Sequence, residues 1–289
     1  MTPTKTILAT ILDPYELSVR FQPIFQIKGG ARRVHSIEAL IRGPRKTHFE
    51  RADILFDYVR RKKAEAVVDQ SCLSAICEAS KGLPEGARIN INVHAATLGQ
   101  NPQFVDFFTR LAQQHSLDLK RFTIEVVEHA PTCNIPELTN NIAKLRSMGV
   151  RIALDDVGLG QSNYRMMLDC HPDYFKLDSY FVNGLSTDLK RRALVGSVVA
   201  LAKALESSVV AEGVASKEDL DQLEAMGVEY AQANFLCPAI SLKKLLAAGY
   251  LDDSGFDGPG RSETRIHKAQ NFGERRQTLS LAVGETFYT

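Results

Sequence analysis

From residue 88 onward, short apolar runs alternate with longer segments in which apolar residues recur three or four positions apart. The short runs predict buried strands, and the longer segments predict helices with one apolar face. Strands that alternate with helices pair in parallel, with the helices outside the sheet. The predicted strands are residues 88–93, 122–127, 152–155, 174–177, 209–212 and 229–232.

Two further predicted strands, residues 21–27 and 34–41, precede this regular pattern. They are joined by a glycine-containing loop, residues 28–33, which is typical of an antiparallel hairpin. The total is therefore eight strands in about 230 residues, the usual size of a (β/α)8 barrel. We predict the α/β class and a TIM-type barrel whose first strand is antiparallel.

The predicted barrel does not use the whole chain. Residues 1–18 are expected to form an N-terminal extension and residues 19–250 the barrel domain. Residues 252–260 are rich in Asp and Gly, like a linker, and most residues after them are polar. We expect residues 251–289 to be a C-terminal tail, partly disordered or packed on the barrel.

The composition is that of an ordinary soluble globular protein, with 44% hydrophobic and 24% charged residues among 289. A net charge of +1 argues against a nucleic-acid polymer as partner. The five cysteines have no paired spacing and are interpreted as free thiols in a reducing compartment. No apolar run approaches the roughly 20 residues of a membrane helix, and the first 12 residues are a poor signal peptide. A cytoplasmic location is expected.

Two adjacent carboxylates, Asp155 and Asp156, end one of the predicted strands. Neighbouring residues of an ideal strand point to opposite faces, so the chain must leave strand geometry if both are to serve one site. Gly158 and Gly160 permit such a departure, because glycine tolerates positive φ. Taken alone, the stretch is explained equally well as a turn.

Polar residues also stand at the C-terminal ends of the other predicted strands, where barrels of this class carry their active sites. Carboxylates converging there would repel one another without cations. Since no His or Cys joins the set, it suits two hard divalent ions, Mg²⁺ or Mn²⁺. Individually, Lys176 is also explained as an ion-pair partner and Asn92 as a loop cap. The set comprises Glu38, Asn92, Glu125, Asp155, Asp156, Lys176, Glu212 and Gln232.

Such a pair of metal ions is the usual arrangement for hydrolysing phosphate esters. Lys176 is placed to orient the attacking water or to neutralise developing negative charge. Arg42 shares a strand face with Glu38 and would grip a second phosphate, although a simple ion pair between the two is the alternative. The residues therefore indicate a two-metal phosphodiesterase whose substrate carries more than one phosphate.

The segment Glu38-Ala39-Leu40-Ile41-Arg42 resembles the signature of the EAL-domain family of cyclic di-GMP phosphodiesterases. The resemblance runs from about Phe21 to Pro238, and the family fold is a TIM-type barrel with an antiparallel first strand. The other matching segments, in order, are Phe21-Gln22-Pro23-Ile24, the Asn92 segment, Glu125-Val126-Val127-Glu128, Asp155 to Gly160, Lys176-Leu177-Asp178, Ala211-Glu212-Gly213-Val214 and Gln232.

The resemblance implies a role for each matching residue and hydrolysis of cyclic di-GMP to linear pGpG. The catalytic residues would be Lys176 and Gln232, beside the attacking water, and Glu128, which would steady the loop after Asp156. Gln22, Leu40 and Arg42 would contact the nucleotide. The metal ligands would be Glu38, Asn92, Glu125, Asp155, Asp156 and Glu212. A homodimer is implied through the loop after Asp156 and residues 164–174, where residues 166–168 are either apolar surface or core.

The sequence departs from the family pattern without losing a metal ligand. The pattern Asp-Phe-Gly-Thr-Gly-Tyr/Phe-Ser-Ser is altered at Val157, Leu159, Gln161 and Asn163, and Gln-Gly-Tyr reads Gln232-Ala233-Asn234. These changes keep open an alternative function, a catalytically weak or inactive cyclic di-GMP receptor. A third interpretation, a barrel enzyme acting on phosphorylated metabolites, fits the ordered set of motifs less well.

Overall fold

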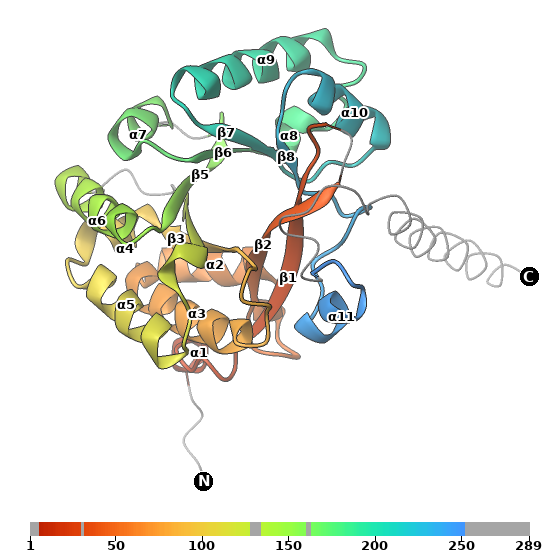
Figure 1. Ribbon diagram of the computed structural model, residues 1–289. Coiled ribbons are helices and arrows are strands. Elements are labelled where there is room, and N and C mark those ends of the chain that lie inside the picture. The colour runs from red at the N-terminus through yellow and green to blue at the C-terminus, as the bar shows by residue number, and fades with distance from the viewer. Residues whose placement is uncertain (1–5, 30–31, 128–133, 160–162, 252–289) are drawn as a thin grey trace, which may run out of the picture.

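Eight strands form one closed barrel and follow one another around it in chain order (Figure 1). The computed structural model describes residues 6–29, 32–127, 134–159 and 163–251. The strands are β1 (Ser18–Gln26), β2 (Arg33–Arg42), β3 (Ile89–His94), β4 (Phe122–Val127), β5 (Arg151–Val157), β6 (Tyr174–Leu177), β7 (Ser208–Ala211) and β8 (Tyr230–Ala231).

The first strand runs against both of its neighbours. β1 is antiparallel to β2 and to β8, and each of the other neighbouring pairs is parallel. Gly29, with φ of 86°, lies in the turn that connects β1 to β2. The predicted TIM-type barrel with an antiparallel first strand is confirmed.

The helices surround the barrel (Figure 1). α1 is attached to the barrel domain, since Ser71 on α3 donates a hydrogen bond to the main-chain oxygen of Leu12. The helices are α1 (Ile7–Ile11), α2 (Ala52–Arg61), α3 (Glu65–Ser80), α4 (Ala95–Gln100), α5 (Phe104–Gln114), α6 (Ile135–Ser147), α7 (Asn163–Cys170), α8 (Ser179–Val182), α9 (Leu189–Ala204), α10 (Lys217–Ala225) and α11 (Leu242–Ala247), with short 3-10 turns at His48–Glu50 and Leu119–Arg121.

Local sequence signals explain where several helices begin and end. Ser216 caps α10, its side-chain oxygen accepting a hydrogen bond from the main-chain nitrogen of Asp219. Asp188 caps α9 in the same way. Between α2 and α3, Lys63 takes a left-handed conformation with φ of 52°, so the basic run at residues 60–63 marks a helix break.

One face of each strand points into the barrel, and its residues change from apolar to polar toward the mouth. Ile24, Ala153, Tyr174 and Val210 form a small buried cluster inside. Each lies two positions from a candidate site residue, a spacing that keeps side chains on one face of a strand. In the same order, the site residues are Gln22, Asp155, Lys176 and Glu212. The strands thus place an apolar layer directly beneath the candidate site.

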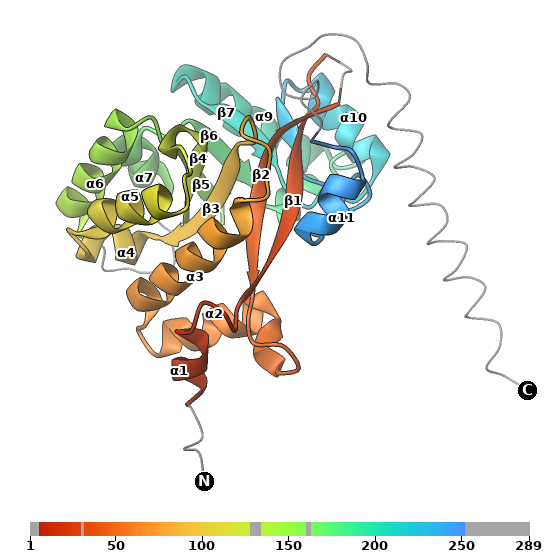
Figure 2. The same ribbon diagram turned by 60° about the horizontal axis from the view of Figure 1, so that its bottom comes forward.

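The β1–β2 hairpin is the longest part of the barrel wall. Figure 2 shows its open end, where β1 begins and β2 ends, extending past the shorter strands to lie beside α2. This extension carries the side chains of the hairpin beyond the barrel mouth.

The described cysteines, Cys72, Cys77, Cys170 and Cys237, are buried and free of disulfides, while Cys133 lies outside the described residues. The reducing compartment and the cytoplasmic location stay predictions. Within the described part of the chain, every helix is too short or too polar to span a bilayer.

Candidate active site

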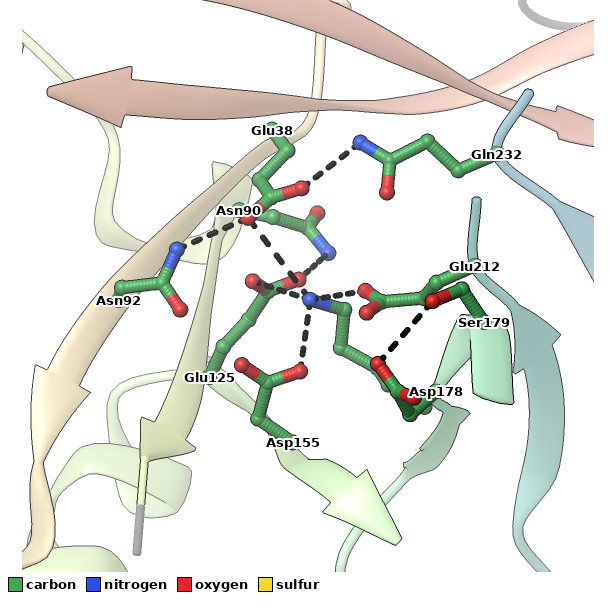
Figure 3. Close-up of polar contacts among 10 residues, drawn as sticks. Glu38, Asn90, Asn92, Glu125, Asp155, Asp178, Ser179, Glu212 and Gln232 are labelled. Carbon is green, nitrogen blue, oxygen red and sulfur yellow. Dashed lines mark hydrogen bonds and ion pairs between the residues drawn. The ribbon is translucent and has the colours of Figure 1, made fainter. Parts of the chain in front are cut away.

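Polar side chains that include Glu38, Glu125, Asp155 and Glu212 converge in the barrel mouth (Figure 3), and they do so around a buried lysine. Lys176 on β6 is only 1% exposed. Its Nζ lies 2.7 Å from Glu125 Oε2, 3.1 Å from Asp155 Oδ1, 2.5 Å from Glu212 Oε1 and 3.8 Å from Glu38 Oε1. Side chains from β2, β4, β5 and the end of β7 therefore meet around one ammonium group.

Side-chain amides orient two of these carboxylates. Asn92 Nδ2 and Gln232 Nε2 donate to the two oxygens of Glu38, at 2.8 and 2.7 Å. Asn90 Nδ2 donates to Glu125 Oε1 at 2.8 Å. Asn90 was not among the predicted site residues, although its position two before Asn92 puts both amides on the same strand face.

The site carries more negative than positive charge. Burial, together with the charge of Glu38, raises the pKa of Glu125 well above its usual value. Burial also raises the pKa of Glu212 to about 8 against the opposing effect of Lys176. Burial alone would raise the pKa of Glu38, but Lys176 and the donated hydrogen bonds hold it below its usual value. One ammonium group does not balance this cluster, so a further cation would be favoured there.

The chain leaves strand geometry between the two adjacent aspartates, as the sequence led us to expect. Asp156 has φ of 50°, and the pairing of β5 with β6 shifts register between Leu154 and Val157. Asp is among the few residue types that tolerate this left-handed region. Gly158, with φ of 103°, continues the turn. As a result Asp155, Asp156 and Glu212 offer oxygen atoms that all lie within 4.8 Å of one another.

This oxygen-rich cluster fits a hard divalent cation. Asp155 Oδ1 and Glu212 Oε1 are buried, and each forms an ion pair with the ammonium group of Lys176. The other nearby candidates, Glu38, Glu125 and Asn92, also present oxygen atoms, which Mg²⁺ and Mn²⁺ prefer. The arrangement is suited to metal-assisted chemistry on an anionic substrate.

The residues expected to contact a nucleotide lie along the β1–β2 hairpin. Gln22 is paired with Glu38 across the two strands, and Arg42 is paired with Ser18. Leu40 and Arg42 are half-buried, and Arg42 donates to the main-chain oxygen of Ile41. Glu128 belongs to residues 128–133, which lie outside the described part of the chain.

The fold and this lysine-centred acidic mouth define a TIM-type barrel with an enzyme-like polar site at the carboxyl ends of its strands. The chain matches the EAL domain over residues 7–239 and belongs to the EAL domain family.

Several relatives carry informative names. The probable cyclic di-GMP phosphodiesterase PdeG of Escherichia coli (strain K12) is 34% identical over 153 residues, which cover 53% of this chain but 30% of PdeG. Among solved structures, the PaMucR phosphodiesterase in complex with c-di-GMP matches with a TM-score of 0.72 and 23% identity, over 82% of this chain and 97% of that one. A standalone EAL protein from Vibrio cholerae O395, bound to c-di-GMP, matches with a TM-score of 0.67 and 20% identity, over 76% of this chain and 90% of that one. At these identities the two structures establish the fold.

Proposed function

We propose that this domain hydrolyses cyclic di-GMP to linear pGpG with the help of two divalent cations, Mg²⁺ or Mn²⁺. The observation that carries the proposal is the convergence of Asp155, Asp156 and Glu212 within 4.8 Å, next to the Lys176-centred carboxylates. Membership of the EAL domain family and the names of its curated relatives supply the substrate.

In this proposal the oxygen cluster holds the cations, which would supply Lewis acidity for cleavage of a phosphodiester. The proposed metal ligands are Glu38, Asn92, Glu125, Asp155, Asp156 and Glu212. Hydrogen bonds from Asn90 and Gln232 fix the rotamers of two of these carboxylates before substrate arrives.

Lys176 and Gln232 are proposed to act on the reacting groups. Both are buried beside Glu38, and Lys176 keeps its proton because burial, which lowers its pKa, is outweighed by Asp155 and the other carboxylates, which raise it well above its usual value. A fixed positive charge there would stabilise negative charge that develops on the phosphoryl oxygens. Glu128 is proposed, from the family resemblance, to steady the loop after Asp156.

The substrate would lie against the β1–β2 hairpin. Gln22, Leu40 and Arg42 face the same side of the hairpin as Glu38, which puts nucleotide contacts and the acidic site in one continuous row. A guanidinium such as that of Arg42 binds phosphate in a bidentate manner.

The deciding experiment is chromatography of the purified protein incubated with cyclic di-GMP and Mg²⁺ or Mn²⁺. We expect pGpG to accumulate with metal and none with EDTA. Tight binding without product under either metal would instead support the receptor function. That alternative is tested because Val157 and Leu159 depart from the family pattern. Neither binding nor product would reject the nucleotide assignment altogether.

We also propose that the domain forms a homodimer through α7 and the loop before it. Leu159, Tyr164 and Leu168 are 51%, 77% and 62% exposed, an apolar surface close to the acidic site. For residues 166–168 the sequence left surface and core equally open, and Met166 and Met167 are buried in the core, because they face the barrel side of α7. Only Leu168 of that group is available to a partner.

A further inference from the structure

A basic pocket lies at the open end of the β1–β2 hairpin, next to the acidic site. It is lined by Arg20, Arg42, Thr47, His48, Glu50 and Arg51. The pocket thus brings together three guanidinium groups and one carboxylate. Arg42 is the only member with a role in the proposed function.

The strand register places Arg20 in the same row as the acidic site. Across β1 and β2, Gln22 is paired with Glu38, Arg20 with Leu40 and Ser18 with Arg42. Cross-strand partners point to the same face, and each step of two residues advances about 7 Å. Arg20 therefore stands one step beyond Glu38, on the way to Arg42.

Among the described residues no carboxylate pairs directly with Arg20 or Arg42, although Glu50 also lines the pocket. Within the described residues neither guanidinium forms an ion pair, and Arg42 donates only to the main-chain oxygen of Ile41. Arg51, in contrast, makes two contacts with Asp53, at 3.1 and 2.6 Å, so its charge is largely satisfied. An anion entering the pocket would be held mainly by Arg20 and Arg42.

The far wall of the pocket is held in place by local packing. The backbone at Gly43 passes so close to the chain that a Cβ there would lie 2.1 Å from the main-chain oxygen of Phe49. The Thr47 hydroxyl donates to the oxygen of Pro44 at 2.7 Å, and the Phe49 ring packs edge-on against Tyr58. Because the wall is fixed in advance, binding there costs little ordering of the loop.

We propose that Arg20 is a specificity-determining residue that, with Arg42, holds the phosphate of the substrate that is not cleaved. Paired guanidinium groups recognise a phosphodiester through short charge-assisted hydrogen bonds. The site would thereby select a dinucleotide with two phosphates over a diester with one. This inference rests on the proposed function, because it assumes cleavage at the Glu38 end of the row.

The test compares Arg20→Gln with the wild type on two substrates, cyclic di-GMP and bis(4-nitrophenyl) phosphate, which has one phosphate. For cyclic di-GMP we expect Kd, measured calorimetrically with Ca²⁺, and KM to rise about tenfold, with kcat unchanged. Turnover of bis(4-nitrophenyl) phosphate should not change. Arg20→Lys should give an intermediate Kd, since it keeps the charge but loses the planar fork. Arg45→Gln is the matched control, an exposed arginine in the loop after β2 that does not line the pocket.

Two results would overturn the inference while leaving the proposed function intact. One is an Arg20→Gln protein that binds cyclic di-GMP as tightly as the wild type. The other is an equal loss of activity of Arg20→Gln on both substrates, which would indicate that the substitution has a general structural effect. Failure of the wild-type protein to bind cyclic di-GMP would reject the proposed function itself and this inference with it.

Discussion

The side-chain amide of Gln22 on β1 donates a hydrogen bond to the side-chain oxygen of Asn234, 3.1 Å away and 212 positions later in the chain. The same nitrogen lies 3.1 Å from the main-chain oxygen of Cys237. Asn234 stands where the family pattern has an aromatic residue. A departure from the pattern thus holds a side chain that we propose contacts the nucleotide.

Asn234→Ala should weaken binding of cyclic di-GMP, because Gln22 loses one of the two groups that fix its rotamer. A hydrogen bond of this kind contributes about 1 kcal/mol, or roughly a fivefold change in Kd. Calorimetry on Gln22→Ala, Asn234→Ala and the double variant checks the connection. If the two effects simply add, Asn234 does not act through Gln22.

Lys176→Ala should abolish hydrolysis and leave binding of cyclic di-GMP nearly intact, because its proposed role lies in the transition state. The variant also leaves Glu125 buried without its cation. It should therefore lose about 3–5 kcal/mol of stability in EDTA and recover part of it with Mg²⁺.

Lys176→Met is the control that separates charge from packing, since it keeps most of the side-chain volume. Urea denaturation should show the same metal-dependent loss for both variants. A methionine variant as stable as the wild type in EDTA would mean that the charge of Lys176 does not offset the carboxylates.

The strands were predictable from sequence because their residues face the barrel interior on one side and helices on the other, which gives continuous apolar runs. The observed bounds of β4 and β6, residues 122–127 and 174–177, coincide with the predicted ones. The shortest strand, β8, covers only residues 230–231 of the four predicted, since β1 pairs with it at just two positions.

The convergence of polar side chains in the barrel mouth was predictable wherever these residues end a periodic strand. The contacts of Gln22 with Asn234 were not, because nothing local links residues so far apart. The sequence predicted only that the chain leaves strand geometry near two glycines. In the structure the positive φ belongs to Asp156 itself. The burial of Met166 and Met167 was not predictable, because the apolar residues of a short helical segment do not reveal which of its faces packs inward.

Divalent cations should raise the melting temperature of the wild-type protein by relieving repulsion among the carboxylates. Glu212→Gln should abolish most of this increase, since Glu212 belongs to the group whose oxygens lie within 4.8 Å. Thermal melts over a series of Mn²⁺ and Mg²⁺ concentrations provide the measurement. Glu218→Gln, an exposed change on α10, should respond like the wild type. An undiminished response in Glu212→Gln would place the cation elsewhere.

Stability should fall in mild acid because of His35 on β2. Its Nε2 lies 3.0 Å from the Tyr174 hydroxyl, and burial, with Arg88 and Arg151 nearby, lowers its pKa from 6.5 to about 3. Below pH 6.5 the imidazole of His35 binds a proton in the unfolded chain but stays neutral in the folded chain. Stability is therefore present above pH 6.5 and is lost as the pH falls toward 3, by at most about 1.4 kcal/mol per unit.

His35→Gln removes this titration, so its stability should change less than that of the wild type between pH 7.5 and pH 5. Urea denaturation at the two pH values measures the difference, which we expect to be about 2 kcal/mol. Equal losses in the two proteins would show that other groups cause the acid sensitivity.

Leu168→Arg should shift the proposed dimer toward monomer, because it puts a charge into an apolar contact. Light scattering coupled to size-exclusion chromatography gives the mass directly. Leu246→Arg is a matched control, since Leu246 is an exposed leucine, 42% accessible, on α11. A wild-type protein that is strictly monomeric at high concentration would contradict the dimer itself.

The closure of the barrel between β1 and β8 has a consequence for synthesis of the protein on the ribosome. β1 meets β8 through the pairs Phe25–Ala231 and Gln26–Tyr230, and Glu38 accepts its hydrogen bond from Gln232, 194 positions later. Hence, in a nascent chain that has emerged only as far as β7, Glu38 lacks Gln232 and Gln22 lacks Asn234. The barrel of such a chain is open at one edge. The acidic mouth is completed only when almost the whole domain has left the exit tunnel, so partial translation products are expected to be inert rather than weakly active.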